Sequence, residues 1–454
     1  MTAIPARTTG AQDAPDKGWL ERVLSPVADV RRGEAATTLL MMLTMLLVLG
    51  GYYLLKTARE IFILSEGGAE VKSYSSAGQA VMLLFIVPAY SAFASRVNRT
   101  QLVQWVNLFF AGNLVLFLVA LRVGLPIGIP FFLWLGIFNV VAIAQLWAFA
   151  ADLFTEEQGK RLFPLIGVGS SLGAWIGSER AGQLVDRYGP SRLLIGGAIS
   201  LVLCVGLVRV IDRITRRVSA ATPAKTADEK LQAGPSGFSM IASDRYLMLI
   251  AALALLLNVV NTSGEYLYGR YVVSTAEAMY GAGPASAAAR QQFIGESYSS
   301  YFGAISLVGF LLQLFVVSRV FKFLGVARSL FVHPIVALTS YVMMLRAPSF
   351  EAIRLLKIAD NSINYSLGNT TMQALWLPTS REKKFKAKQA VDSFFVRMGD
   401  VVSAGFVYIG ELAALGVSAF AAINVAAACL WLAVATGLRS QLHAQANQSG
   451  KAEL

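Results

Sequence analysis

Residues 37–64, "TTLLMMLTMLLVLGGYYLLKTAREIFIL", form an apolar run that contains Lys56, Arg59 and Glu60. The run is long enough to cross a lipid bilayer, which requires roughly 20 residues. The three charges stand at positions i, i+3 and i+4, so a helix presents them on one face. Charged groups inside a span cost free energy unless they face protein or water. The stretch therefore predicts a membrane-spanning helix with a charged, internal face.

A second interpretation is that this helix ends near Leu55 and that the charged side chains snorkel to the membrane surface. The apolar residues 61–64 argue against it, because they would then lie in water. We therefore expect the three charges to face a cavity inside the protein.

The composition predicts an all-α membrane protein with many spans. Of the 454 residues, 56% are hydrophobic and 15% are charged, and the mean hydropathy is +0.58. These values exclude an ordinary soluble domain. The apolar segments predict twelve transmembrane helices, with approximate cores at 37–64, 75–95, 102–122, 127–151, 162–185, 192–211, 246–270, 299–319, 326–346, 351–377, 389–412 and 416–437.

A basic, hydrophilic stretch at 212–244 has the composition of a flexible linker and divides the predicted spans into six and six. Two six-helix halves joined by a linker match the major facilitator architecture. The predicted parts are a polar N-terminal tail at 1–36, a first half at 37–211, the linker at 212–244, a second half at 245–438 and a C-terminal tail at 439–454.

Lys and Arg concentrate in the N-terminal tail, between spans 2 and 3, in the linker, and between spans 10 and 11. Because positively charged loops stay cytoplasmic, both termini are expected inside, and the polar start predicts no cleaved signal. "GQLVDRYG" at 182–189 then lies outside and is interpreted as a turn, although facilitators carry a similar pattern in a cytoplasmic loop. The net charge of +12 is explained by this topology and by anionic membrane lipids as partners. Nucleic acid is not required, and a monomer suffices.

Polar side chains recur in six predicted spans, as a substrate pathway between two halves requires. The basic ones favour an anionic solute, and the acidic ones suit proton coupling or ion pairing. The candidate substrate-binding residues are Lys56, Arg59, Glu60, Asn139, Gln145, Asn261, Glu265, Arg270, Asp360, Asn361 and Asn364. The candidate gating or structural residues are Lys160, Arg161, Glu179, Arg180, Lys386, Lys388 and Asp392.

Three glycines in the fifth predicted span follow one another at intervals of four residues. Gly169, Gly173 and Gly177 therefore lie on one helical face, where the lack of a side chain lets another helix approach closely.

Four stretches together resemble the nucleotide transporter family, the ATP/ADP translocases of plastids and obligate intracellular bacteria. They are "LLKTAREIFIL" followed by "GAEVKSY", "AQLWAFAADLFTEEQGKRLFPLIGVGSSLG", "NVVNTSGEY" and "NYSLGNTTMQALWLPTSREKKFKAKQAVD". The resemblance implies that Lys56, Arg59 and Glu60 stand for the Arg, Lys and Asp of the family motif. It likewise maps Glu265 onto a functionally required acid.

The chain departs from the family at two charged places. Gln145 stands where the family has a Glu before Leu-Trp, and Met372 and Gln373 stand where it has a Lys-Glu pair. The resemblance thus implies a divergent member in a bacterial inner membrane.

The sequence predicts a secondary-active transporter that moves a small anionic solute by alternating access, such as ATP, ADP or a related phosphorylated metabolite. The alternatives are a proton-coupled exporter or carrier of a non-nucleotide metabolite, and then a membrane enzyme or a non-transporting sensor. "GVGSSLG" lacks the ending of a phosphate-binding loop, and His333 and His443 have no metal-ligand spacing. We therefore expect no catalytic residues, metal site or cofactor.

Overall fold

The computed structural model describes residues 30–31, 33–94, 97–219, 236–346 and 349–448. The regular elements in these ranges are all helices, as the sequence predicts. They are α2 (Ala35–Ala94), α3 (Arg99–Arg122), α4 (Gly128–Leu153), α5 (Glu156–Tyr188), α6 (Ser191–Ser219), α7 (Gly237–Ser243), α8 (Arg245–Tyr280), η1 (Pro284–Ser286), α9 (Ala287–Phe315), α10 (Val317–Ser329), α11 (Val332–Met344), α12 (Phe350–Ile363), η2 (Asn364–Gly368), α13 (Asn369–Ala374), α14 (Arg381–Ala390), η3 (Val391–Phe395), α15 (Val396–Leu412) and α16 (Val417–Gln448).

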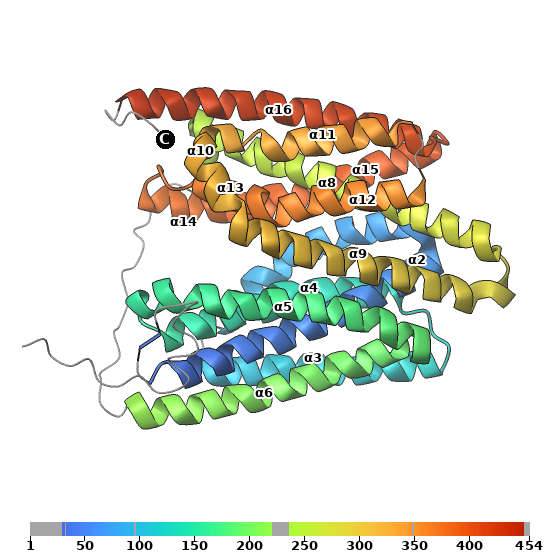
Figure 1. Cartoon of the computed structure of the whole chain (residues 1–454), viewed down its shortest axis with the longest axis horizontal. Helices are drawn as coiled ribbons and strands as arrows, with labels where there is room; N and C mark the ends of the chain where they lie inside the picture. Colours follow the sequence, from blue (N-terminus) through green and yellow to red (C-terminus); the bar gives the residue numbers. More distant parts are fainter. Residues whose placement is uncertain (1–29, 32, 95–96, 220–235, 347–348, 449–454) are drawn as a thin grey trace, which may run out of the picture.

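The long helices run roughly alongside one another (Figure 1). Helices α3, α4, α5 and α6 lie in the lower part of the view, and α8 and α11–α16 lie in the upper part. Helix α2 packs on α4, α5 and α6 and also reaches α8, α9 and α15, while α5 packs along α9. The helices α2, α5, α9 and α15 therefore join the N-terminal helices to the C-terminal ones.

Seven described helices are long and apolar enough to cross a membrane, or eight if α10 and α11, bent by 78° at their junction, form one span. The expectation of a helical protein with many spans is thus confirmed, but the twelve predicted spans are not all supported. In this count of seven, α2 is a single helix although it covers two predicted spans. Predicted spans 10 and 11 are interrupted by the π-helical turns η2 and η3, which leave shorter α-helical pieces.

Helix α2 continues through the charged stretch and does not end near Leu55. Gly68, with a φ of +70°, breaks it into a first arm at 35–67 and a second arm at 69–94. The side chains of Ile61–Leu64 are at most 3% exposed. The snorkelling interpretation is therefore wrong, because the charges lie within a buried part of the helix.

Helices extend into the segments that the sequence predicts as linker and C-terminal tail. Helix α6 extends to Ser219 and α7 occupies Gly237–Ser243, so both ends of the predicted linker at 212–244 are helical. Its middle, 220–235, lies outside the described residues. Helix α16 likewise continues to Gln448, into the predicted C-terminal tail. Most of the predicted N-terminal tail lies outside the described residues.

The glycine face of α5 packs directly on the first arm of α2. An added Cβ at Gly169, Gly173 or Gly177 would overlap the carbonyl oxygens of Met42, Leu46 and Gly50, respectively. The predicted close approach is confirmed, and its partner is the helix that carries the charged stretch. Close backbone contact of this kind provides the dispersion attraction that holds helices together in a bilayer.

We predict that Gly173→Ala lowers the free energy of unfolding by about 1–3 kcal/mol, because the new methyl group overlaps the Leu46 backbone. The matched control is Gly167→Ala in the same helix, where a Cβ meets open space. Thermal unfolding in detergent should show a lower melting temperature for the first variant alone. Equal melting temperatures for the two variants would contradict the packing.

Candidate functional site

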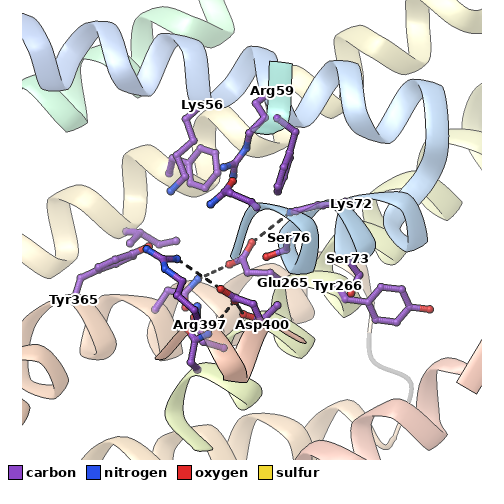
Figure 2. A pocket seen from close by; sticks show the side chains of 18 of the residues that line it. Lys56, Arg59, Lys72, Ser73, Ser76, Glu265, Tyr266, Tyr365, Arg397 and Asp400 are labelled. Carbon is purple, nitrogen blue, oxygen red and sulfur yellow. Dashed lines mark hydrogen bonds and ion pairs between the residues drawn. The ribbon is translucent and has the colours of Figure 1, made fainter. Parts of the chain in front are cut away.

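A cavity of about 230 Å³ lies where helices from the two parts of the chain meet. It is lined by α2, α4, α8, α9, α12, η2 and α15. In Figure 2, Lys56 and Arg59 extend from one side and Arg397 and Asp400 from the opposite side, with Lys72 and Glu265 between them. We call it the central cavity. Its charged lining residues are Lys56, Arg59, Lys72, Glu265, Arg397 and Asp400.

The three charged residues predicted on the first arm of α2 lie in two different environments. Lys56 and Arg59 line the central cavity. Glu60 is fully buried beside it, where it accepts hydrogen bonds from Arg59 and forms an ion pair of 2.7 Å with Lys72. Because a buried carboxylate needs charged partners to remain ionised, Glu60 holds both cations at the cavity wall.

Lys56 differs from the other cations of the cavity because aromatic rings surround its ammonium group. Its Nζ lies 4.0 Å from the ring centroid of Phe302 and 5.1 Å from that of Tyr53. Among the described residues, it forms no ion pair with a carboxylate. Ring faces are thus its contact partners, and its ammonium group is available to a negatively charged ligand.

Lys72 connects both arms of α2 to the C-terminal helices. Besides its ion pair with Glu60, its Nζ lies 3.7 Å from Glu265 of α8 and donates a hydrogen bond of 3.2 Å to Tyr298 of α9. The sequence analysis did not select Lys72. A signal was present, because Lys72, Ser76 and Gln79 follow the Gly68 break at i, i+4 and i+7 and therefore share one helical face.

The amide and acidic residues of predicted spans 7 and 10 meet at the opposite wall. Glu265 accepts hydrogen bonds from Tyr301 at 2.8 Å and from Asn361 at 2.7 Å. Asn364, in η2, donates to Asn261 at 3.5 Å. The structure thus brings Asn261, Glu265 and Asn361 to one wall of the cavity, with Asn364 bonded behind it.

Helix α15 adds a pair of charges to the cavity that the sequence analysis had not assigned to binding. Arg397 lies 3.6 Å from Asp400, whose carboxylate also accepts hydrogen bonds from Thr262 at 2.7 Å and Asn258 at 2.9 Å. The cavity lining and Glu60 together hold four cations, Lys56, Arg59, Lys72 and Arg397, and three carboxylates, Glu60, Glu265 and Asp400.

Six predicted binding residues lie outside the cavity lining, namely Glu60 and Asn364, described above, and Arg270, Gln145, Asn139 and Asp360. Arg270 forms an ion pair with Glu411 at 2.7 Å. Gln145 accepts a hydrogen bond from Tyr90 at 3.0 Å, and Asn139 is a partly buried residue of α4. Asp360 is buried beside Lys357.

The predicted gating residues lie apart from one another on several helices. Arg161 pairs with Glu34, Lys388 with Asp392, and Arg180 donates to Gln183. Glu179 lies against Gly303 of α9, and the Lys386 carbonyl lies against Gly237 of α7. The side chain of Lys160 lies outside the described residues.

The central cavity has contrasting surroundings on its two sides. Toward the Gly68 break, α5 and α9 are joined by hydrogen bonds from the Gly182 N–H to Ser299 and from Gln292 to Asp186. On the other side, a cavity of about 880 Å³ is lined by α2, through Leu83, Leu84, Val87 and Pro88, and by Lys388, Ser393 and Arg397. Because Arg397 lines both cavities, the central cavity adjoins the larger one at the end of the bundle opposite to Gly68.

No family model matches the chain. Among curated proteins, it is 23% identical over 308 residues to ADP,ATP carrier protein 4 of Rickettsia bellii, a match that covers 59% of this chain and 56% of the carrier. The carrier of Rickettsia felis gives 23% identity, with 59% and 57% covered. The chain is a distant relative of the Rickettsia ADP,ATP carriers. It spans little more than half the length of the curated relatives that it matches.

Solved structures share the fold at low sequence identity. A structure of a bacterial metal transporter has a TM-score of 0.60 and 12% identity, with 89% of this chain and 98% of that chain covered. The nucleoside transporter NupG has a TM-score of 0.61 and 10% identity, with 89% and 99% covered. This distant carrier relative is therefore an integral membrane protein that shares the fold of these structures. No group of three metal-ligating side chains occurs in the part of the chain that the structure describes.

Outside the candidate spans, Glu34 ties the start of α2 to α5. Partial burial would raise the pKa of the Glu34 carboxyl, but hydrogen bonds from Arg161, from the Arg31 N–H and from Gln158 hold it below its usual value of 4.5. A depressed folded-state pKa contributes stability above the unfolded pKa, and this contribution is lost as the pH falls through the folded value.

We therefore predict that Glu34→Gln lowers the melting temperature at neutral pH and that its difference from the unaltered protein narrows below about pH 4.5. The measurement is thermal unfolding over a pH series. Glu351→Gln, at an exposed helix end, is the control and should have little effect at neutral pH. A Glu34→Gln effect that stays constant down to pH 3 would contradict the linkage.

Proposed function

We propose that this protein is a secondary-active transporter that moves an anionic, phosphorylated solute, with ATP and ADP as the first candidates. The observation that carries the proposal is the central cavity, where the lining and the adjoining Glu60 together hold four cations and three carboxylates, and where Lys56 contacts ring faces. An anion in the cavity would balance the excess positive charge. The distant relation to the ADP,ATP carriers of Rickettsia supports the nucleotide as the solute.

The proposed mechanism is alternating access between two halves of six spans each. We assign the first half to 37–211 and the second to 245–438, with the linker and both termini at the cytoplasmic side of a bacterial inner membrane. The twelve spans follow if α2 crosses twice, once with each arm, if α5 also crosses, if α10 and α11 form one span, and if η2 and η3 are bends within single spans. In this orientation the Gly68 end is external and closed, and the larger cavity opens toward the cytoplasm.

The central cavity could open to either side of the membrane, because the contacts around it are made between the two halves of the protein. On the Gly68 side of the cavity, the two halves are joined by the contacts of Lys72 with Glu265 and Tyr298 and by the α5–α9 hydrogen bonds. Opening that side requires these contacts to break, and an anion that attracts Lys72 would compete with Glu265 for it.

A second candidate function is the transport of a smaller anion, such as inorganic phosphate or a short phosphate ester. The central cavity, at about 230 Å³, is smaller than the 300–1,000 Å³ typical of sites for drug-sized ligands. The uncharged residues Gln145 and Met372 also favour this candidate, because they stand where the resembling family carries charges.

The deciding experiment is uptake of radiolabelled ATP into vesicles reconstituted with the full chain and preloaded with ADP. Uptake that depends on internal ADP supports nucleotide exchange. Uptake of radiolabelled phosphate, with none of ATP, supports the second candidate. The absence of uptake for ATP, ADP, phosphate and glycerol phosphate would contradict the proposal of an anion carrier.

We predict that Lys56→Gln raises the KM of the transported anion roughly 10- to 100-fold, since a hydrogen bond to a charged group contributes about 1.5–3 kcal/mol. The fold should persist, because the lysine forms no ion pair that the substitution would break. The matched control is Lys322→Gln, a lysine on the exposed side of α10 that should leave the KM unchanged. Equal KM values for the two variants would remove Lys56 from the binding site.

A further inference from the structure

A second cluster of ionisable side chains is buried between α11 and α12, outside the lining of the central cavity. Lys357, Asp360 and His333 are 0%, 2% and 6% exposed, respectively. Lys357 Nζ lies 2.8 Å from Asp360 Oδ2, and His333 Nε2 lies 3.3 Å from Asp360 Oδ1. Burying charged groups costs several kcal/mol even when they are paired, and a hydrophobic replacement is often as stable. A cluster of this kind inside a membrane bundle therefore calls for a functional explanation.

The hydrogen bonds of the cluster determine which nitrogen of His333 is open. Asp360, beside the Lys357 ammonium, is an ionised carboxylate that only accepts hydrogen bonds, so Nε2 of His333 carries a hydrogen and donates. In the neutral ring Nδ1 is then an acceptor with a lone pair. Nδ1 is buried and has no hydrogen-bond partner in the protein.

Nδ1 faces a place that can admit water. It points toward Gly368, the last residue of η2, where an added Cβ would lie 2.9 Å from it. A small cavity of about 20 Å³ is lined by His333, Gly368 and Thr371, and the Thr371 hydroxyl also lacks a partner. A volume of about 10–15 Å³ is enough for one water, so the small cavity can hold a single water beside these unpartnered groups.

No other charged side chain lines the small cavity within the described residues. Helix α12 contributes Lys357 and Asp360 to the cluster, and Tyr341 of α11 lies 3.5 Å from Lys357. Helix α16 presents the Trp431 ring to the imidazole, with 4.7 Å between the ring centroids. The proton acceptor that faces the water position is therefore His333.

We propose that His333 Nδ1 is a proton-binding site, poised by Asp360 and Lys357, and that the bound proton moves together with the transported anion. Nδ1 takes a proton from a hydronium ion that enters the small cavity, which leaves water, and later returns it to water. The ring then donates from both nitrogens, to Asp360 and to the water. The net charge of the cluster rises from zero to +1 when the proton binds.

Helix α12 connects this site to the central cavity. Asn361, the residue after Asp360, donates a hydrogen bond of 2.7 Å to Glu265, and Asn364 of η2 donates to Asn261. The lipid and protein surroundings screen charge weakly, so a positive charge at His333 favours an anion in the central cavity. By reciprocity the anion favours the proton. This coupling, though not the proton site itself, depends on the proposed function.

The proton site can be tested without a substrate because the chain has only two histidines, His333 and His443. His443→Gln, at the exposed end of α16, leaves His333 as the single signal in protein labelled with ¹⁵N-histidine. Spectra are recorded in detergent from about pH 8 to about pH 5, and a proton bound at Nδ1 should convert the neutral form of the ring into the protonated form. The variant lacking both histidines should show no signal. A ring that keeps one form throughout this range would overturn the site.

The coupling is tested in reconstituted vesicles with two assays of ATP uptake. One is driven by a pH gradient, and the other is counterflow against internal ADP at equal pH. In His333→Gln, the ATP accumulation driven by the pH gradient should fall at least tenfold while counterflow persists. His443→Gln should retain both activities. Retained accumulation, or loss of both activities in His333→Gln, would overturn the coupling. Absence of ATP uptake in the unaltered protein would refute the nucleotide proposal, whereas the histidine titration would still decide the proton site.

Discussion

The ion pair between Lys72 and the fully buried Glu60 is the interaction on which the central cavity depends. An ionised carboxylate without contact to water is tolerable only when cations and hydrogen-bond donors surround it. Glu60 has Arg59 on its own helix and Lys72 across the Gly68 break. This need fixes how the two arms of α2 lie against each other. It also places two cations at the wall of a cavity that no single helix could build.

The pairs of the central cavity form a chain across the protein and not a set of isolated bridges. Lys72 lies near Glu60 and Glu265, and Glu265 in turn accepts hydrogen bonds from Tyr301 and Asn361. A ligand that attracts one cation therefore alters the partners of several helices at once. Such a chain is a physical basis for converting the binding of an anion into a rearrangement of helices.

Two further features make this arrangement possible, and both concern the backbone. The glycines of α5 let the first arm of α2 pack at backbone contact, which anchors the helix that carries Lys56 and Arg59. The π-helical turns η2 and η3 interrupt α12–α13 and α14–α15 close to the two cavities. A π turn shifts the helical face by the insertion of one residue and often marks a functional site. Here η2 carries Asn364 and Tyr365 toward the central cavity and Gly368 toward His333.

The sequence by itself determined the helical membrane class, the close packing of the α5 glycines, and the internal position of Lys56, Arg59 and Glu60. These properties follow from composition and helical periodicity, which are local. Only the tertiary structure decided that Lys72 and Arg397 join the central cavity, that Arg270 pairs with Glu411 outside it, and that His333 meets Asp360. The physical reason is that periodicity fixes which face of one helix a residue occupies, whereas a partner on another helix depends on how the helices pack. The Gly68 break and the π turns also change the direction in which a helix face points, and a regular helical period does not predict that change.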